Sequence, residues 1–326
     1  MKVVVLHGDV SEDAGMDEKD VLVQAGFVAS ILSDLGYEPI IIPFSLNFSK
    51  TIEILKEIRP AFIFNLVETT AGQGSLIHIA PSLMDFLKIP YTGAKTDAQF
   101  LTSNKVLAKR FLQAAGIATP LFFLPDEHYG GSFVEGTYIV KAVWEHASSW
   151  LNENSILFTK DHHRLREAVL SQQENLGMAC FAEEFIEGRE FNISLLAGDE
   201  GPDVLPHAEI LFDDYPSGKA RVVDYRSKWV EDSFEYQHTP RCFDFSKEDL
   251  PLLRQLTDLS LRCWRIFGLR GYARVDFRID KSGMPWVLEV NTNPCLSPDG
   301  GFFAAVERSG LSFNQAIERI IKDAHR

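Results

Sequence analysis

The sequence predicts a mixed fold that begins with an open parallel α/β sheet and continues into two further units. Strand and helix signals alternate over residues 1–95, which is typical of such a sheet. A helical segment at residues 104–115 is then followed by short strand-like runs, and an apolar hairpin stands near the C-terminus. We therefore expect an N-terminal α/β domain at residues 1–95, a central unit at 96–180 and a C-terminal unit at 181–326.

Composition limits the possible partners. The chain has 326 residues, of which 45% are hydrophobic and 24% charged, as in ordinary globular proteins. A formal net charge of -14 argues against nucleic acid or an anionic membrane as the main partner, because both require an extended basic surface. The four cysteines match no CxxC pattern, and no apolar run approaches the ~18 residues of a membrane span. We expect a soluble cytoplasmic protein with reduced thiols.

The N-terminal unit combines three expected strands with three expected helices. The strands are expected at residues 2–6, 39–42 and 61–66, and the helices at residues 21–35, 50–58 and 76–87. Polar residues cluster at the strand ends, at His7-Gly8-Asp9, Asn65 and Glu68, where open α/β sheets place ligands. His7 is equally compatible with a turn residue. No GxGxxG or GxxxxGK[ST] motif occurs, so neither a dinucleotide fold nor a P-loop is supported.

The central unit is expected to begin with a helix at residues 104–115 that Gly116 closes. A strand at residues 137–142 then places Lys141 near its end, followed by the polar stretch 145–149. Lys141 has two equally weighted interpretations. It could extend its amine to solvent from an apolar strand, or it could neutralise a bound phosphate together with nearby amides and hydroxyls.

The C-terminal unit is expected to open at Cys180 with two strand-like runs. These runs flank Glu187-Gly188-Arg189, which indicates a linking turn. A long helix is expected at residues 249–267, and a final helix at residues 313–322 carries isoleucines on its apolar side.

A hairpin between these two helices carries the strongest site signal. One strand is expected at residues 272–279, a turn at 280–283, and a second strand that ends in Leu288–Pro294. If the loop holds two or four residues, paired positions sum to an odd number. The side chains at positions 274, 276, 289 and 291 then share one face.

This face would bring together the guanidinium of Arg274, the carboxylates of Asp276 and Glu289, and the carboxamide of Asn291. Hard oxygen ligands without histidine or cysteine suit magnesium, with substrate phosphates completing its shell. The alternative is that these side chains form the solvated polar face of an ordinary hairpin. Unpaired charges rarely cluster beside an apolar strand, which makes this alternative the less favoured one.

Taken together, these segments resemble the ATP-grasp superfamily and, within it, the D-alanine-D-alanine ligases. The resemblance covers nearly the whole chain, and it is carried most strongly by Pro90–Gly93 with Lys105 downstream, Phe185–Phe191, Gly271–Asp276, Leu288–Pro294 and Gly310–Phe313. It implies α/β and α+β architecture in which ATP lies between two α+β units and the N-terminal α/β unit covers an amino-acid site. It also suggests a homodimer through the N-terminal unit.

The resemblance implies a role for each matching residue. ATP phosphates would contact Lys105 and Lys141, the adenine would lie at Glu183, Glu184, Phe185 and Ile186, and the ribose at Glu190. Magnesium, as two ions with manganese as a substitute, would be held by Asp276, Glu289 and Asn291. The implied catalytic set is Arg274 and Lys228 at the acyl phosphate, Glu18 at the amino group of the first substrate, and Ser148 in the phosphate loop. Glu68 and Gly300 would belong to the amino-acid site.

The implied reaction activates a carboxylate by phosphoryl transfer from ATP, after which an amine attacks the acyl phosphate. Arg274 and a backbone amide near Gly300 would meet the charge of the tetrahedral intermediate. Water would hydrolyse the acyl phosphate, so residues 213–229 are expected to close over the site.

Departures from the ligase pattern concern the substrates. Gly300 replaces a serine that usually helps to hold the carboxylate of the second amino acid, and Trp229 replaces a tyrosine. Residues 146–150 replace the glycine-rich phosphate loop. Glu68 stands where the family often has histidine, which favours a more cationic substrate.

Two other functions remain open at this point. The first is a phosphotransferase that stops after phosphorylating a small molecule, for which Arg274 would be unnecessary as an oxyanion partner. The second is a non-catalytic nucleotide-binding protein, which the survival of three metal-ligand candidates disfavours.

Overall fold

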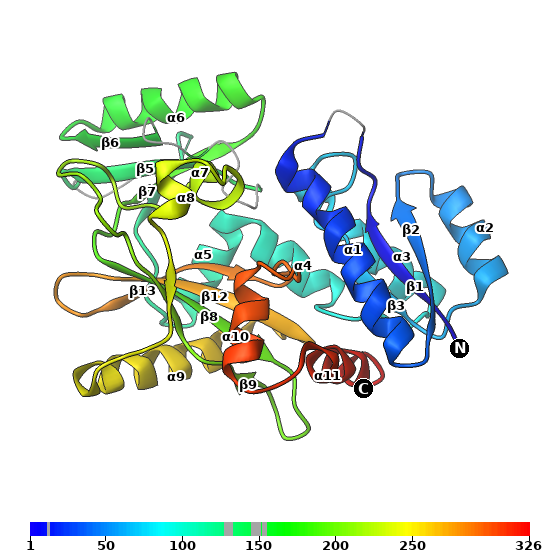
Figure 1. The fold of residues 1–326 in the computed structure, drawn as a ribbon. Coiled ribbons are helices and arrows are strands. Elements are labelled where there is room, and N and C mark those ends of the chain that lie inside the picture. Colours follow the sequence, from blue (N-terminus) through cyan, green and yellow to red (C-terminus); the bar gives the residue numbers. More distant parts are fainter. Residues whose placement is uncertain (12–13, 127–132, 145–150, 152–154) are drawn as a thin grey trace.

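The computed structural model describes residues 1–11, 14–126, 133–144, 151 and 155–326. Within these residues the strands form three sheets, and Figure 1 shows the helices packed around them. In the same part of the chain, no helix is long and apolar enough to cross a membrane.

A parallel sheet with the strand order β2-β1-β3 forms the N-terminal part of the fold, as predicted. Its elements are β1 (Lys2–Gly8), α1 (Met16–Asp34), β2 (Glu38–Phe44), α2 (Phe48–Ile58), β3 (Ile63–Leu66), η1 (Gly74–Leu76) and α3 (Ile79–Leu87). The strand β1 extends through His7 and Gly8, so these two residues belong to the strand and not to the turn after it. Glu68 lies just past the carboxyl end of β3, at the sheet edge where a ligand was expected.

An antiparallel sheet with the strand order β4-β7-β5-β6 forms the central part. The elements of this region are α4 (Thr96–Ser103), α5 (Lys105–Ala114), β4 (Phe122–Phe123), β5 (Gly136–Ala142), β6 (Ile156–Thr159), α6 (His162–Leu176) and β7 (Cys180–Glu184). Helix α6 packs on the sheet through Leu165 and Val169. Because β7 lies between β4 and β5, a boundary between residues 180 and 181 would separate this strand from its sheet. The pairing favours a boundary after Glu184.

Helix α4 was not predicted. Its buried side consists of Ala98, Gln99, Thr102 and Ser103, which are small or polar. An apolar repeat of helical period is therefore missing from the sequence here, and the helix contacts other elements through polar groups, as in the 3.3 Å hydrogen bond between Thr102 Oγ1 and Thr292 Oγ1.

An antiparallel sheet with the strand order β11-β10-β8-β12-β13 forms the C-terminal part, and β9 also pairs with β8. The elements of this region are β8 (Arg189–Leu196), β9 (Asp203–Val204), β10 (Ala208–Ile210), α7 (Tyr225–Trp229), α8 (Phe234–Gln237), β11 (Arg241–Cys242), η3 (Lys247–Asp249), α9 (Leu250–Ile266), β12 (Tyr272–Ile279), β13 (Pro285–Asn291), α10 (Gly301–Arg308) and α11 (Phe313–Ala324). The expected long helix and final helix are confirmed as α9 and α11. Helix α9 covers one face of the sheet through Leu256 and Cys263.

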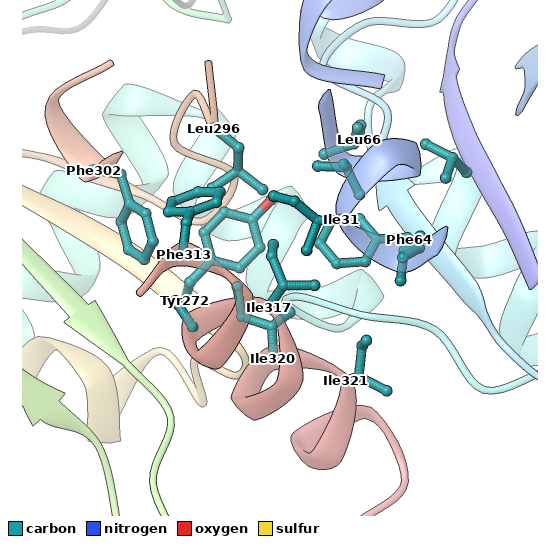
Figure 2. Close-up of a cluster of buried hydrophobic side chains, with 14 of the residues drawn as sticks. Ile31, Phe64, Leu66, Tyr272, Leu296, Phe302, Phe313, Ile317, Ile320 and Ile321 are labelled. Atoms are coloured by element: carbon teal, nitrogen blue, oxygen red, sulfur yellow. The ribbon is translucent and has the colours of Figure 1, made fainter. Parts of the chain in front are cut away.

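One apolar core joins the two ends of the chain, and Figure 2 shows it. Phe64 and Leu66 of β3 belong to the same cluster as Tyr272 of β12 and Ile317 and Ile320 of α11. Burial of these side chains stabilises the docking of the N-terminal sheet beside the C-terminal sheet. The cavity described below includes residues from both.

The chain passes from β7 to β8 through a close contact at Gly188. The sequence indicated a turn here, but β7 and β8 lie in different sheets, so the segment links two sheets and does not close a hairpin. Gly188 has a φ of 156°, and a Cβ atom at this position would lie 1.8 Å from the carbonyl oxygen of Ile279. Only glycine allows the linker to pass this close to the end of β12.

Replacing Gly188 with alanine is expected to lower the free energy of unfolding by about 3 kcal/mol or more, because the linker or β12 must move. The control is Gly26→Ala in α1, where no heavy atom lies within 4 Å of the added Cβ. That variant is expected to keep or raise stability by about 0.5–1 kcal/mol. Urea unfolding followed by tryptophan fluorescence measures both variants, and equal stabilities would contradict the role given to Gly188.

Candidate functional site

A cavity of about 460 Å³ is lined by residues of the N-terminal, central and C-terminal parts of the fold. Among the described residues, every predicted site residue except Glu18 lines it. The side chain of Glu18 is exposed at the start of α1, and Ser148 lies outside the described residues together with the rest of the stretch 145–150. Segments far apart in the sequence therefore contribute to one site.

A β-bulge in the β12–β13 hairpin decides which side chains face this cavity. Residues 280–284 join the strands, and Ile279 pairs with Pro285. This register alone would turn Asp276 and Glu289 to opposite faces. The register shifts by one residue between Asp276 and Phe277, so that Asp276 pairs with Glu289. The expected shared face is confirmed, but the expected loop length was wrong, and the bulge restores the pairing.

Positive charges surround the two facing carboxylates. Arg274 Nε lies 2.7 Å from Oδ1 of Asp276, and Arg274 Nη2 lies 2.8 Å from Oδ2. The carboxamide nitrogen of Asn192 donates to the same Oδ1 atom at 3.0 Å. On the other strand, Lys105 Nζ lies 4.0 Å from Oε1 of Glu289. These contacts offset the repulsion between carboxylates placed opposite each other.

The oxygen atoms of Asp276, Glu289 and Asn291 form a donor set that fits magnesium. The backbone N–H of Asn293 donates to Oδ1 of Asn291 at 2.9 Å, which fixes the orientation of that carboxamide. Within the described residues, no group of three or more His, Cys, Asp or Glu side chains is placed to hold a metal. Two carboxylates and a carboxamide would leave coordination positions for phosphate oxygens and water, as magnesium commonly requires.

Lysines engage both carboxylate oxygens of Glu183 in β7. Lys141 Nζ lies 2.5 Å from Oε1, and Lys109 Nζ lies 2.5 Å from Oε2. Burial would raise the pKa of the Glu183 carboxyl, but the two lysines hold it below its ordinary value. Glu183 was expected in the adenine hinge, which would form partly through backbone groups, and its side chain contacts this lysine pair. Sequence reasoning missed Lys109.

If residues 183–186 contact adenine as expected, the contacts would come from backbone groups, and two of these groups are already hydrogen-bonded. The N–H of Glu184 donates to the carbonyl of Leu121, and the N–H of Phe185 donates to the carbonyl of Thr137, both at 2.8 Å. These two amides hold the central sheet together. Any hinge contact with a base would fall to the other backbone groups of this segment, including those of Ile186.

Glu190, the residue expected at the ribose, forms an ion pair with Arg278, which the sequence analysis did not single out. Arg278 Nη2 lies 2.8 Å from Oε2 of Glu190, and Arg278 Nη1 donates to the carbonyl of Gly188 at 2.9 Å. The Arg278 guanidinium lies 5.6 Å from the centroid of the Phe185 ring and 5.4 Å from that of Phe212. Arg278 thus orients Glu190 and buries its own charge against aromatic faces.

The segment at residues 213–229 covers one side of the cavity. Val222, Val223 and Lys228 line it, and the carbonyl of Arg221 accepts a hydrogen bond from Arg278. Tyr225 Oη donates to Oδ1 of Asp17 at 3.4 Å, which links this cover to the N-terminal part. Burial, followed by the nearby charge of Arg274, lowers the pKa of Lys228.

The end of the cavity beside the N-terminal sheet is acidic. Gln24 Nε2 donates to Oδ2 of Asp20 and to Oε1 of Glu68, both at 3.0 Å, and Ser297 Oγ donates to Oδ1 of Asp20 at 2.7 Å. The pKa of Glu68 is raised to about 7, mainly by burial; the Gln24 hydrogen bond opposes this rise, and the charges of Asp20 and Asp17 add to it. Asp20 lines this end of the cavity, whereas the expected residue Glu18, two positions earlier in α1, is exposed.

An arginine lines the cavity near Gly300, the position where the family pattern has a serine. The N–H of Gly300 donates to the carbonyl of Ser297 at 2.8 Å, so the oxyanion donor expected near Gly300 would be a neighbouring amide. Arg241 in β11 lines the cavity here, and its Nη1 donates to the carbonyl of Asp299 at 3.1 Å. A Cβ atom at Gly301 would lie 3.3 Å from Arg241 Nε, so glycine makes room for the guanidinium.

Comparisons with known proteins identify related sequences and folds. The sequence profile of the family described as "D-ala D-ala ligase C-terminus" matches residues 158–322. A D-alanine--D-alanine ligase of Aquifex aeolicus is 28% identical over 98% of this chain and 100% of its own length. One from Carboxydothermus hydrogenoformans is 29% identical over 98% of this chain and 97% of its own. The crystal structure of D-alanine--D-alanine ligase from Bacillus anthracis complexed with ATP has a similar fold, with a TM-score of 0.72, 20% identity and coverage of 100% and 98% of the two chains.

Replacing Glu68 with glutamine is expected to change the pH dependence of stability. The folded protein keeps a proton on Glu68 up to about pH 7, whereas the ordinary value of its pKa is 4.5. The stability that this proton contributes is therefore full below pH 4.5 and is lost as the pH rises through 7. Glu68→Gln stays neutral, so the free energy of unfolding should rise by about 1–3 kcal/mol at pH 8 and change little at pH 5.

Urea unfolding at both pH values measures this effect, with Glu57→Gln on the exposed side of α2 as the control. A gain for Glu68→Gln of the same size at pH 5 and pH 8, or no gain at pH 8, would contradict the raised pKa.

Proposed function

Because this chain belongs to the D-ala D-ala ligase C-terminus family, we propose that it is an ATP-dependent carboxylate–amine ligase that joins two amino-acid-like substrates through an acyl phosphate. The observation that carries the proposal is the cluster on the β12–β13 hairpin. Arg274, Asp276, Glu289 and Asn291 face one cavity, which Lys105 and Lys141 also line. A chain with a net charge of -14 thus concentrates cations where phosphates would lie.

ATP and magnesium are the cofactors of this reaction. Lys105 and Lys141 would contact the phosphates, Glu190 the ribose, and the backbone of residues 183–186 the base. Asp276, Glu289 and Asn291 would hold magnesium, which when bound neutralises the phosphoryl oxygens during in-line transfer. Arg274 contacts both oxygens of Asp276 in this structure, so the metal and this guanidinium would share the carboxylate.

The residues of the chain account for the two chemical steps. A substrate carboxylate attacks the γ-phosphorus of ATP, ADP leaves, and an acyl phosphate forms. The amine of the second substrate then attacks the acyl carbon, phosphate leaves, and the amine loses a proton to give the amide. Arg274 and Lys228 stabilise the negative charge that builds on the acyl oxygen. The cover at residues 213–229 excludes water, which would otherwise hydrolyse the acyl phosphate.

The residues of the amino-acid site favour an amino acid as the first substrate and as the second. Asp20 and Glu68 suit the ammonium group of the first substrate, and they add acceptors for a second cationic group. Arg241 suits the carboxylate of the second substrate, in place of the serine that the family pattern contains. Retention of Arg274 supports a ligase rather than a phosphotransferase. A homodimer stays a prediction, which sedimentation equilibrium would test.

The direct test is magnesium-dependent ADP release from ATP with D- and L-amino acids, singly and in pairs, followed by mass analysis. Release that requires two amino acids and yields a condensed product would support the ligase. Release with one compound and a phosphorylated product would show a phosphotransferase. ATP binding without ADP release across the panel would favour the non-catalytic alternative.

Asp276→Asn is expected to reduce turnover by at least about 100-fold while the thermal midpoint of unfolding changes little, because one metal-binding charge is lost. The control is Asp244→Asn, an exposed surface residue that pairs with Arg308. Near-normal turnover in Asp276→Asn would refute the metal assignment.

Arg241→Met is expected to raise KM for the second amino acid by at least about tenfold, since a charge-assisted carboxylate contact is lost, while KM for ATP stays within about threefold. The matched control is Arg308→Met on the surface of α10. The primary amide of the same amino acid lacks the carboxylate, so Arg241→Met should affect it little. An equal effect on the amino acid and its amide would exclude a carboxylate contact.

A further inference from the structure

Glu183 joins two lysines that differ in their access to the cavity. Lys109 and Glu183 are each 1% exposed, and Lys109 Nζ also donates to Thr119 Oγ1 at 2.9 Å. The side chain of Lys141 is 18% exposed and lines the cavity. Lys109 is a described residue, and it does not line the cavity. Any effect of Lys109 on a bound nucleotide must therefore act through Glu183 and Lys141.

The charges of the three groups explain why two lysines are needed. A pair formed by Glu183 and Lys141 alone would be neutral, and a nearby phosphate would meet little net charge. Lys109 balances the carboxylate from the opposite side, so the three groups together carry one positive charge. Burial lowers the pKa of Lys109, and the charge of Glu183 opposes this without restoring the ordinary value. Each oxygen of the carboxylate lies 2.5 Å from one lysine nitrogen, so the buried negative charge faces a cation on both sides.

Helix α5 carries both Lys105 and Lys109. Lys105 begins α5 and lines the cavity, and Lys109 follows four residues later on the same side of the helix. Asn104 caps this helix by accepting a hydrogen bond from the N–H of Leu107 at 2.9 Å. One turn of α5 therefore separates the lysine expected at the phosphates from the one that pairs with Glu183.

From these contacts we propose that Lys109 is a positioning residue of the nucleotide site. It neutralises Glu183, so that Glu183 orients Lys141 without cancelling the positive charge that Lys141 presents to the phosphates. This inference rests on the proposed function only in placing ATP in the cavity, and it does not require that an amide is formed.

The test is direct titration of ATP, without magnesium and with magnesium, into purified variants by calorimetry. Lys109→Met is expected to weaken ATP binding by at least about tenfold, because Glu183 then cancels the charge of Lys141. In the double variant Lys109→Met with Glu183→Gln, the buried carboxylate is gone, and ATP affinity is expected to return to within about threefold of the natural protein. Lys160→Met, which breaks the exposed pair with Glu135, is the matched control.

A purely structural role for Lys109 makes a different prediction. It would lower the unfolding midpoint of Lys109→Met without a specific loss of ATP affinity, and the Glu183→Gln change would restore no affinity. Unchanged ATP binding in Lys109→Met, or no recovery in the double variant, would overturn the proposal. If Lys109→Met does not fold, the double variant is compared with Glu183→Gln alone, and a tenfold weaker affinity in the double variant would overturn it.

Titration separates this proposal from the proposed function. If ATP binds and responds to the variants as expected but no amide is formed, the role of Lys109 stands and the ligase assignment fails. If amides are formed but ATP affinity does not depend on Lys109, the ligase stands and the positioning role fails.

Discussion

The pairing of Asp276 with Glu289 across β12 and β13 is the constraint on which the site depends. Two carboxylates placed opposite each other repel, and burial beside an apolar strand increases the cost. The structure offsets this cost with cations from several elements: Arg274 from the same strand, Lys105 from α5, and Lys228 from α7 near both. The resulting concentration of positive charge in an acidic protein is what makes the cavity suitable for phosphates.

A comparable arrangement of charges recurs at the central sheet. Glu183 is a buried carboxylate whose two oxygens are met by Lys109 and Lys141. In both places a carboxylate orients a cation that faces the cavity, and a second cation balances the carboxylate. Charged groups held in this way need little reorganisation when a phosphorylated substrate binds, which is the physical basis of electrostatic preorganisation. The substrate end differs, because Asp20 and Glu68 are bridged by an amide and retain an acidic character.

Much of this arrangement could be predicted from local patterns. The three parallel strands, α9, α11 and the β12–β13 hairpin follow from apolar periodicity, and the residue types on the hairpin indicate a metal and phosphate site. Helix α4 escaped prediction because its buried side is small and polar. The β7–β8 segment was interpreted as a turn because a glycine between two strand-like runs has the same local signature whether the strands pair or enter different sheets. Glu18 was expected at the amino-acid site through resemblance and is exposed in the structure, while Asp20 of the same helix lines the cavity.

The sequence by itself therefore determined which segments are strands and helices, and which chemical groups are available to bind ATP, metal and amino acids. Periodicity and residue type are local properties, and they are written directly in the chain. Only the tertiary structure decided how these groups pair. The bulge that aligns Asp276 with Glu289, the contact of Lys109 with Glu183, and the place of Arg241 beside Gly301 each join elements whose approach is set by packing. Such contacts depend on the balance of burial and charge across the whole fold, which no short stretch of sequence contains.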